Sequence, residues 1–506
     1  MNEPPVVNPW LAAIAVMSAT FMVVLDTTVV NVSLPYIAGS LSATVNESTW
    51  ALTSYVAANA VILPLTGWLA SLVGRKRLLI GSVVGFTAAS ALCGLAPSLS
   101  MLIVFRVIQG ATGGVMQPLS QAVLLESFPP AERGKAMGFW GLGIVVAPIL
   151  GPVLGGWLTD NYSWRWVFYI NIPIGVLSVI LLRLFVFDPS YLKRAAAKID
   201  YFGIAFMTVG IGCLQIMLDE GQENDWFQSS FITTLGVLAV AGLIAFIIRE
   251  LYVEDPVVDL TIFRDRTYAV GATLMTVVGF VLFGSLVLLP VMMQTLLGYP
   301  PLQAGIALAP RGIGSLIAMP IVGMITSRVD SRKLVALGLL TGGITLLWLG
   351  DLNLNAGYWD FFWPQFFQGA ALGLLFVPLT TVTMGTISRE KMGNAASVFN
   401  LVRNIGAGIG IAAVATMLTR FRVTHASVMA EHITMYDPRV RAMVGAIPDP
   451  HAVASLQGMV LQQAALLAFI DAFRILGWVF IALLPLVLLM RRQAPHGAAP
   501  TVIVAD

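Results

Sequence analysis

Three ionisable side chains lie deep inside long apolar stretches of this chain: Asp26, Arg106 and Arg403. A charged group in a lipid-spanning segment costs about 2.5 to 3.5 kcal/mol on insertion scales, so each of the three needs a reason to be there. A carboxyl group at Asp26 can bind and release a proton when its access alternates between the two sides of a membrane. The alternative is a structural aspartate, bonded to neighbouring threonines or held in a static pair with an arginine.

Arg106 keeps its proton under physiological conditions, so we expect it to set the electric field felt by a nearby carboxylate or by a bound substrate. A neutral Gln365 takes the corresponding place later in the chain, which favours proton handling in the first half. The alternative for Arg106 is a packing role with backbone carbonyls as partners. Arg403 is expected near the end of its span, where a long side chain can snorkel to the interface.

A ridge of small residues marks the fifth apolar stretch, where one small side chain recurs every four positions. Another helix can approach such a ridge closely, and prolines beside it bend the helix. We therefore expect this stretch to form a tight seam that closes one side of a transport pathway. The ridge residues are Gly143, Ala147, Gly151 and Gly155, and the prolines are Pro148 and Pro152.

A short polar loop, Gly74 to Arg77, joins two apolar stretches. Gly74 permits a tight turn, and Arg75 and Lys76 can pair with acidic side chains or with helix ends. Such contacts would hold one conformation until a proton or substrate shifts it. Plain topology signalling explains the charges equally well.

The composition identifies the elements that must position these residues. Of 506 residues, 58% are hydrophobic and 11% are charged, whereas soluble domains carry roughly 25% charged residues. The chain is therefore predicted to be an all-α polytopic membrane protein, because a span needs about 20 apolar residues. Fourteen candidate spans begin near Leu11, Thr49, Leu78, Met101, Ala136, Trp164, Tyr201, Phe227, Tyr268, Gln303, Leu334, Phe361, Ala395 and Phe473.

Charge and cysteine usage exclude several classes of function. The net charge is only +2 and the basic residues lie in short loops, so nucleic acid is not an expected partner. Cys93 and Cys213 lie in separate apolar stretches, which predicts packing roles and no metal site. The chain also contains no P-loop motif for ATP.

The basic residues also predict the orientation of the chain, because basic residues in short loops resist translocation. Most of the basic residues fall in loops on one side of the membrane. Because the number of spans is even, both termini lie on that same side. We therefore expect a multi-pass protein of the bacterial inner membrane with both termini in the cytoplasm. The basic loops on that side include 75–77, 133–135, 183–198, 264–266, 328–333 and 389–391.

An internal repeat predicts how the spans are grouped. Gly67 to Leu78 recurs as Gly323 to Leu334, and one span later Gln109-Gly110 matches Gln368-Gly369. The repeat is thus six spans long, and duplicated bundles hold substrate at their interface. We expect a six-helix bundle over 1–190, two inserted helices over 191–260, and a second six-helix bundle over 261–506 with a long periplasmic segment over 419–472.

Together these motifs resemble the major facilitator superfamily, specifically the EmrB/QacA type of drug:proton antiporter with fourteen spans. The resemblance covers nearly the whole chain. It rests on Leu25-Asp-Thr-Thr-Val-Val-Asn31, the loop motif 67–78, Arg106-x-x-Gln109-Gly110, and the antiporter motif Gly151-Pro-Val-Leu-Gly-Gly156. One departure is Ser71, where the superfamily motif usually carries an acidic residue.

The resemblance implies a secondary active transporter, not an enzyme, which uses the proton gradient and no cofactor to export hydrophobic toxic small molecules. It further implies a tripartite system with a periplasmic EmrA-like adaptor and a TolC-type outer-membrane channel. The implied proton-coupling residues are Asp26 and Arg106, the gating residues are Gly67, Gly74, Arg75, Lys76, Gly151, Pro152 and Gly155, and the candidate pathway residues are Asn31, Gln109, Gln121, Gln365 and Arg403.

Three alternatives remain open at this point. The same scaffold could be a proton-coupled importer, or it could export one endogenous lipophilic metabolite. A membrane enzyme or sensor would instead need histidines and carboxylates clustered at one membrane face. The four histidines lie in the segment after residue 419 and in the tail, which argues against that class.

Overall fold

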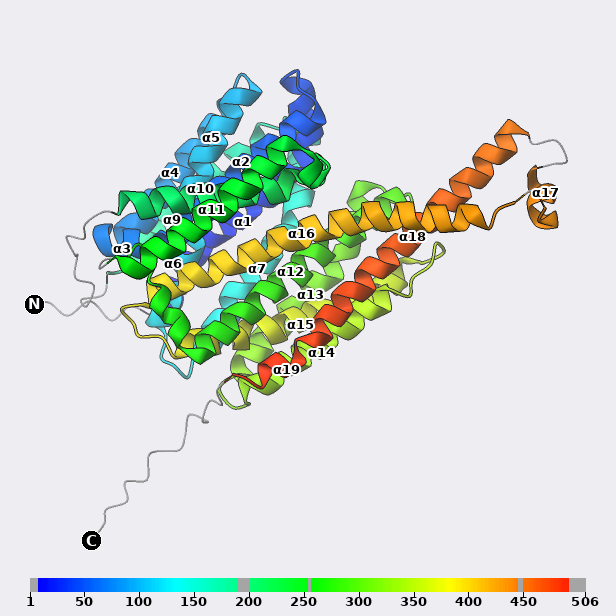
Figure 1. The fold of residues 1–506 in the computed structure, drawn as a ribbon. Coiled ribbons are helices and arrows are strands. Elements are labelled where there is room, and N and C mark those ends of the chain that lie inside the picture. Colours follow the sequence, from blue (N-terminus) through cyan, green and yellow to red (C-terminus); the bar gives the residue numbers. More distant parts are fainter. Residues whose placement is uncertain (1–7, 189–199, 254–255, 435, 445–448, 491–506) are drawn as a thin grey trace, which may run out of the picture.

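A computed structural model describes residues 8–188, 200–253, 256–434, 436–444 and 449–490 (Figure 1). Within those ranges the regular elements are helices, as lipid requires of a spanning chain that must satisfy its own backbone hydrogen bonds. Thirteen helices are long and apolar enough to cross a membrane, and one bent pair raises the number to fourteen. The predicted fold class is confirmed.

The first set of helices covers residues 9 to 185. It consists of α1 (Pro9–Ser40), α2 (Val45–Ile62), α3 (Thr66–Val73), α4 (Arg75–Leu95), α5 (Leu99–Gly113), α6 (Met116–Ser127), α7 (Arg133–Asn161), α8 (Trp166–Tyr169) and α9 (Asn171–Phe185). Helices α5 and α6 run on as one candidate span, and so do α8 and α9.

The bent pair is α2 and α3, whose axes meet at 62°. Pro64 lies in the break between them. A proline lacks the backbone N–H that a helix needs and its ring clashes with the preceding turn, so a helix breaks or kinks there. The bend turns Gly67 toward the second set of helices.

Two helices follow, and then the second set. Helices α10 (Tyr201–Glu220) and α11 (Ser230–Tyr252) pack against each other, with the short 3-10 helix η1 (Trp226–Gln228) between them in sequence. The second set consists of η2 (Leu260–Arg264), α12 (Arg266–Thr295), α13 (Pro301–Ile325), α14 (Ser331–Leu349), α15 (Tyr358–Gly385), α16 (Met392–Glu431), α17 (Pro438–Val444), α18 (Pro450–Ala482) and α19 (Leu484–Val487).

The two sets repeat the same packing. Helix α1 packs on α7 as α12 packs on α16, α2 packs on α5 as α13 packs on α15, and α4 packs on α9 as α14 packs on α18. Helix α10 packs against α2 of the first set and against α16 of the second. We call the two sets the first half and the second half.

The halves touch at one end of the bundle, which carries residues 74–77 and 328–333 and is called the basic end here. Contacts between the halves there join α7 to α13 and α15, and join α16 to α3 and α6. Figure 1 shows the helices of the two halves converging toward this end and diverging toward the opposite one.

The last span differs from its prediction. It was expected to begin near Phe473, but α18 begins at Pro450 and its first buried side chain is that of Ala464. The predicted start of this span is too late because polar and charged residues interrupt its apolar sequence. They are Gln462, Gln463, Asp471 and Arg474. In Figure 1 the far part of α16 and the near part of α18 extend beyond the other helices, with α17 beside their tips.

Candidate functional site

Asp26 lies at the centre of a buried polar network formed by four helices of the first half, and its direct partners come from two of them, α5 and α9. Its side chain in α1 is fully buried. Arg106 Nη1 of α5 lies 2.6 Å from Asp26 Oδ2. Gln109 Nε2 and Asn171 Nδ2 donate to Asp26 Oδ1 at 2.9 and 2.7 Å. The carboxylate is thereby paired and hydrogen-bonded, which is how a protein holds an ionised group away from water.

Arg106 makes several contacts besides its ion pair with Asp26. Its Nε donates to the backbone oxygen of Ala51 at 2.9 Å, and its Nη1 also donates to Gln109 Oε1 at 2.8 Å. The guanidinium carbon of Arg106 lies over the Tyr55 ring, 4.1 Å from the ring centroid. A cation over an aromatic face gains further electrostatic attraction. Among the described residues, Nη2 finds no hydrogen-bond partner.

Two members of the network were missed in the sequence. Asn171 Nδ2 also donates to Ser90 Oγ at 3.0 Å, and Ser90 Oγ donates to the backbone oxygen of Phe168 at 2.8 Å. Asn171 and Ser90 are both fully buried. A polar residue at the start of an apolar run, as in Asn171-Ile-Pro, was the available signal.

The second half contains a neutral version of the same network. Ser285, Gln365 and Gln368 each follow Asp26, Arg106 and Gln109 by 259 positions. Gln368 Nε2 donates to Ser285 Oγ at 3.3 Å, and Gln365 Nε2 donates to Gln368 Oε1 at 3.2 Å. The hydrogen-bonded arrangement is therefore kept in the second half without its charges.

The small-residue ridge of α7 lies against α1, the helix that carries Asp26. A Cβ atom added at Gly151 would meet the side chain of Thr28, and one added at Gly155 would lie 2.7 Å from the backbone oxygen of Val29. Pro152 lies inside α7 and is half-buried. The ridge thus brings α7 into backbone contact with α1 within one turn of Asp26.

The other end of α7 touches the second half. A Cβ atom at Gly138 would lie 2.7 Å from the backbone oxygen of Met319 in α13. The rings of Trp140 in α7 and Phe376 in α15 stack with centroids 5.7 Å apart. Helix α7 therefore links the Asp26 helix to the opposite half.

The loop at Gly74 joins three spans of the first half. Gly74 has φ 93°, in the region that favours glycine. Arg75 is buried and forms an ion pair with Glu126 of α6. The Lys76 N–H donates to Asp188 Oδ1 and its Nζ donates to the Arg183 oxygen, both at 2.7 Å.

Ser71 and Gly67 complete this region. Ser71, where the superfamily motif usually carries an acidic residue, donates its Oγ to the Trp68 oxygen of its own helix at 2.7 Å. A Cβ atom at Gly67 would lie 2.7 Å from the backbone nitrogen of Asn394 in α16. The first repeated loop motif therefore rests on the opposite half.

Gln121 and Arg403 lie where α6 of the first half meets α16 of the second. Asn400 Nδ2 donates to Gln121 Oε1 at 2.5 Å, and Arg403 Nη2 donates to Gln117 Oε1 at 3.0 Å. The prediction that Arg403 snorkels toward an interface was wrong, because its side chain is buried and bonded to the facing helix. Asn31, by contrast, is exposed on α1.

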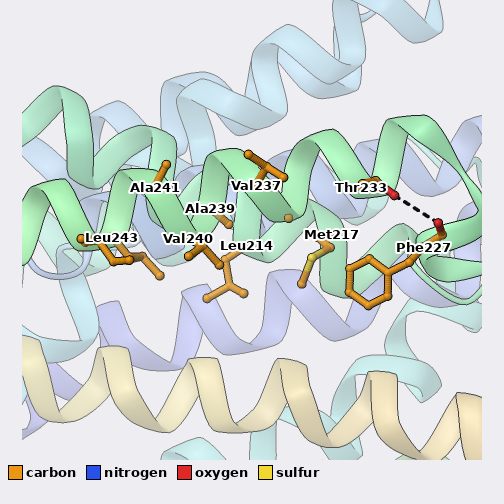
Figure 2. A pocket seen from close by; sticks show the side chains of 11 residues that line it. Leu214, Met217, Phe227, Thr233, Val237, Ala239, Val240, Ala241 and Leu243 are labelled. Atoms are coloured by element: carbon orange, nitrogen blue, oxygen red, sulfur yellow. Dashed lines mark hydrogen bonds between the residues drawn. The ribbon is translucent and has the colours of Figure 1, made fainter.

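A separate apolar groove lies on the inserted helices. Figure 2 shows side chains of α10 and α11 lining it, including Leu214, Met217, Val237 and Val240. Its volume is about 650 Å³. It contains none of the residues predicted for proton coupling, gating or the pathway.

Two similar halves that pack against each other, with a buried ion pair in one of them, are typical of a polytopic membrane transporter. Residues 16–411 match the family model described as Major Facilitator Superfamily, and the chain belongs to that family. The resemblance inferred from the motifs is confirmed.

Two related proteins are similar in sequence to this chain over nearly its whole length. The chain is 40% identical to the fatty acid resistance protein FarB of Neisseria gonorrhoeae over 97% of this chain and 98% of that protein. It is 38% identical to the multidrug export protein EmrB of Escherichia coli (strain K12) over 94% of each.

Two solved structures of other transporters share the overall fold of this chain. The proton:xylose symporter XylE matches with a TM-score of 0.62 at 14% identity over 96% of each chain. The human organic anion transporter MFSD10 matches with a TM-score of 0.62 at 13% identity, over 96% of this chain and 100% of that one.

Proposed function

We propose that this transporter exports hydrophobic toxic small molecules from the cytoplasm in exchange for protons. The observation that carries the proposal is the Asp26–Arg106 pair: the first half has a buried, titratable carboxylate, while the second half keeps serine and glutamines at the equivalent places. An intramembrane ionisable residue is by default a functional candidate. The charged version of the network is the natural site of proton coupling.

A proton on Asp26 would change the forces among three helices. Protonation removes the negative charge that balances Arg106, so the attraction joining α1 to α5 weakens and two donors to Asp26 lose an ionised acceptor. Helix α1 contacts α7 through Thr28 and Val29. Since α7 also reaches α13 and α15, a shift of α1 is passed to the contact between the halves.

The orientation follows from the basic loops. We place the basic end in the cytoplasm, because Arg75, Lys76, Arg77, Arg332 and Lys333 lie there and basic loops stay inside. The halves meet at that end (Figure 1). The structure then corresponds to a state whose halves are in contact on the cytoplasmic side.

The proton gradient supplies enough free energy for such export. One proton moving inward gains about 2.3 kcal/mol per 100 mV and about 1.4 kcal/mol per pH unit. At one-to-one exchange this sustains a gradient of a few hundred-fold for a neutral substrate. The names of the FarB and EmrB relatives, fatty acid resistance and multidrug export, support toxic compounds as the cargo.

A tripartite assembly is the natural setting for the extended helices. We propose that the protruding parts of α16 and α18, with α17, face the periplasm and contact an EmrA-like adaptor that leads to a TolC-type channel. Val428, Val453 and Met459 are exposed there. Exposed apolar side chains on helices beyond the bundle are suited to pairing with a partner helix.

The test is substrate-driven proton movement in proteoliposomes that contain a pH-sensitive dye. Wild type, Asp26→Asn and the matched control Ser285→Ala are compared with a panel of lipophilic weak acids and cationic dyes. We expect proton movement in wild type and in the control and none in Asp26→Asn. Equal responses in all three would place coupling elsewhere, and the absence of any response in wild type would contradict proton-coupled export. The direction of flux under an imposed pH gradient separates export from import.

A further inference from the structure

The five buried arginines of the described residues differ in how their charge is balanced. Arg106 and Arg75 form ion pairs with Asp26 and Glu126, and Arg133 is the first residue of α7, at the end of its span. Two remain, and neither forms an ion pair with a described carboxylate. These are Arg311 and Arg403, exposed by 8% and 7%.

Arg311 and Arg403 lie in different surroundings. Arg311 Nη2 donates to the backbone oxygen of Leu282 at 3.3 Å, and both residues belong to helices of the second half. Arg403 faces the other half: its Nη2 donates to Gln117 Oε1 at 3.0 Å and approaches Asn404 Oδ1 at 3.5 Å. Arg403 therefore lies at the contact between the halves, and Arg311 inside one of them.

Two buried hydrogen-bond donors at the contact around Arg403 have no acceptor among the described residues. Arg403 Nε is buried without a hydrogen-bond partner among the described residues, and so is Gln121 Nε2. Gln121 sits one turn of α6 away from Gln117, and Asn400 one turn of α16 away from Arg403. Two unused donors, one of them charged, thus belong to side chains of two facing helices.

This arrangement is unfavourable as it stands. A buried cation without an anion loses its hydration and gains little from neutral amides in return. Buried donors without acceptors add a further penalty. A bound anion would remove both, because a carboxylate has two oxygens and accepts planar, paired hydrogen bonds from a guanidinium.

We propose that Arg403 and Gln121, held in place by Gln117 and Asn400, form an anion-binding site between the halves that takes the carboxylate of an amphipathic ligand. The inference rests on the proposed export function and names the group by which cargo is held. The carboxylate accepts from Arg403 Nε and from Gln121 Nε2. The site lies within the membrane-spanning parts of α6 and α16, so its ligand needs an apolar body to reach it. Because the site uses both halves, it exists fully only while these helices are in contact.

The experiment measures binding and not transport. Purified protein in nanodiscs is titrated with dodecanoate at pH 8, where the probe is ionised, and with dodecanol, which has the same chain without the charge. The variants are Arg403→Gln, Arg403→Lys and Gln121→Leu, and Arg311→Gln is the control because it is an equally buried arginine inside one half. Intrinsic tryptophan fluorescence reports occupancy.

We expect Arg403→Gln to weaken dodecanoate binding by about 10- to 100-fold, the range for losing a charged hydrogen-bond partner. Dodecanol affinity should stay within about twofold, since an alcohol makes little use of the charge. Arg403→Lys should retain part of the affinity, Gln121→Leu should lose about 5- to 10-fold, and Arg311→Gln should match wild type.

Three outcomes would overturn the proposal: unchanged dodecanoate affinity in Arg403→Gln, equal losses for dodecanoate and dodecanol, or a larger loss in Arg311→Gln than in Arg403→Gln. If Arg403→Gln does not fold, Gln121→Leu decides the question by the same comparison of ligands. The binding measurement needs no proton gradient, whereas proton coupling is tested by substrate-driven proton movement in proteoliposomes, so failure of proton coupling and failure of this site are distinguishable.

Discussion

Gly67 and Gly323 occupy equivalent positions in the two repeated loop motifs, and each lies against the first turn of a helix in the opposite half. A Cβ atom on Gly67 would lie 2.7 Å from the Asn394 nitrogen, and one on Gly323 would lie 2.7 Å from the Gly134 oxygen. Gly134 and Gly393 begin equivalent helices, α7 and α16. The halves therefore close on each other through two matching backbone contacts.

Gly67→Ala should open this contact. The added methyl group meets backbone atoms, which cannot rotate away, so the helices must separate. We expect a longer distance between spin labels placed at Arg77 and Arg389, which are exposed on opposite halves. Gly81→Ala is the control, because nothing lies within 4 Å of its added Cβ atom. An unchanged distance distribution in Gly67→Ala would contradict the role of this contact.

Gly155→Ala should damage the seam between α7 and α1, whereas its neighbour Gly156→Ala should not. The first methyl group would lie 2.7 Å from the Val29 oxygen, and the second would lie 4.0 Å from its nearest neighbour, a methyl of Val32. Overpacking of this kind costs about 1 to 3 kcal/mol. Thermal unfolding in detergent and substrate efflux by cells check both variants. Equal behaviour of the two would show that the ridge does not depend on this contact.

Removing both charges of the buried pair should cost less stability than removing one. Arg106→Gln leaves Asp26 buried without its cation, at a cost of about 3 to 5 kcal/mol. The double variant Asp26→Asn with Arg106→Gln resembles the neutral network of the second half, which keeps its hydrogen bonds without charges. We expect the double variant to recover thermal stability but not proton movement. Recovery of proton movement would remove Asp26 from the coupling mechanism.

Asp259 links the segment before α12 to the start of α16 through an ion pair with Lys391. The stability that this ion pair contributes depends on pH. Burial alone raises the pKa of the Asp259 carboxyl, but hydrogen bonds from Lys391 and from Thr261 outweigh it and hold the pKa below its ordinary value. Lys391 Nζ lies 2.7 Å from Asp259 Oδ2. Since the pKa is lower in the folded state, this stabilisation is present above the ordinary pKa of about 3.9 and is lost as the pH falls below it.

The corresponding variant is Asp259→Asn. Because half of the Lys391 side chain is exposed, the loss at pH 7 should be at most about 1 kcal/mol. Thermal unfolding measured from pH 7 down to pH 3 should show the difference from wild type shrinking below about pH 4. Glu431→Gln, at the exposed end of α16, should match wild type throughout. A difference that stays constant down to pH 3 would rule out the ion pair as its source.

The sequence predicted features that depend on patterns along one helix. Spans follow from apolar length, and Asp26 and Arg106 stand out because charge is rare in lipid. Partners on other helices are set by three-dimensional packing, which explains why Asn171 and Ser90 were missed. Arg403 was misplaced for the same reason: distance from a helix end does not tell whether a facing helix covers the side chain. The start of α18 was missed because polar residues on one face of a long helix hide its apolar face.

Helix α16 runs without a break for 40 residues, from the turn that touches Gly67 to the tip beyond the bundle. A helix of that length is a rod of about 60 Å. A tilt of about 10° at its base would carry the far tip through about 10 Å. A rigid rod of this length would turn a small tilt at its base into a much larger displacement of anything seated on its tip.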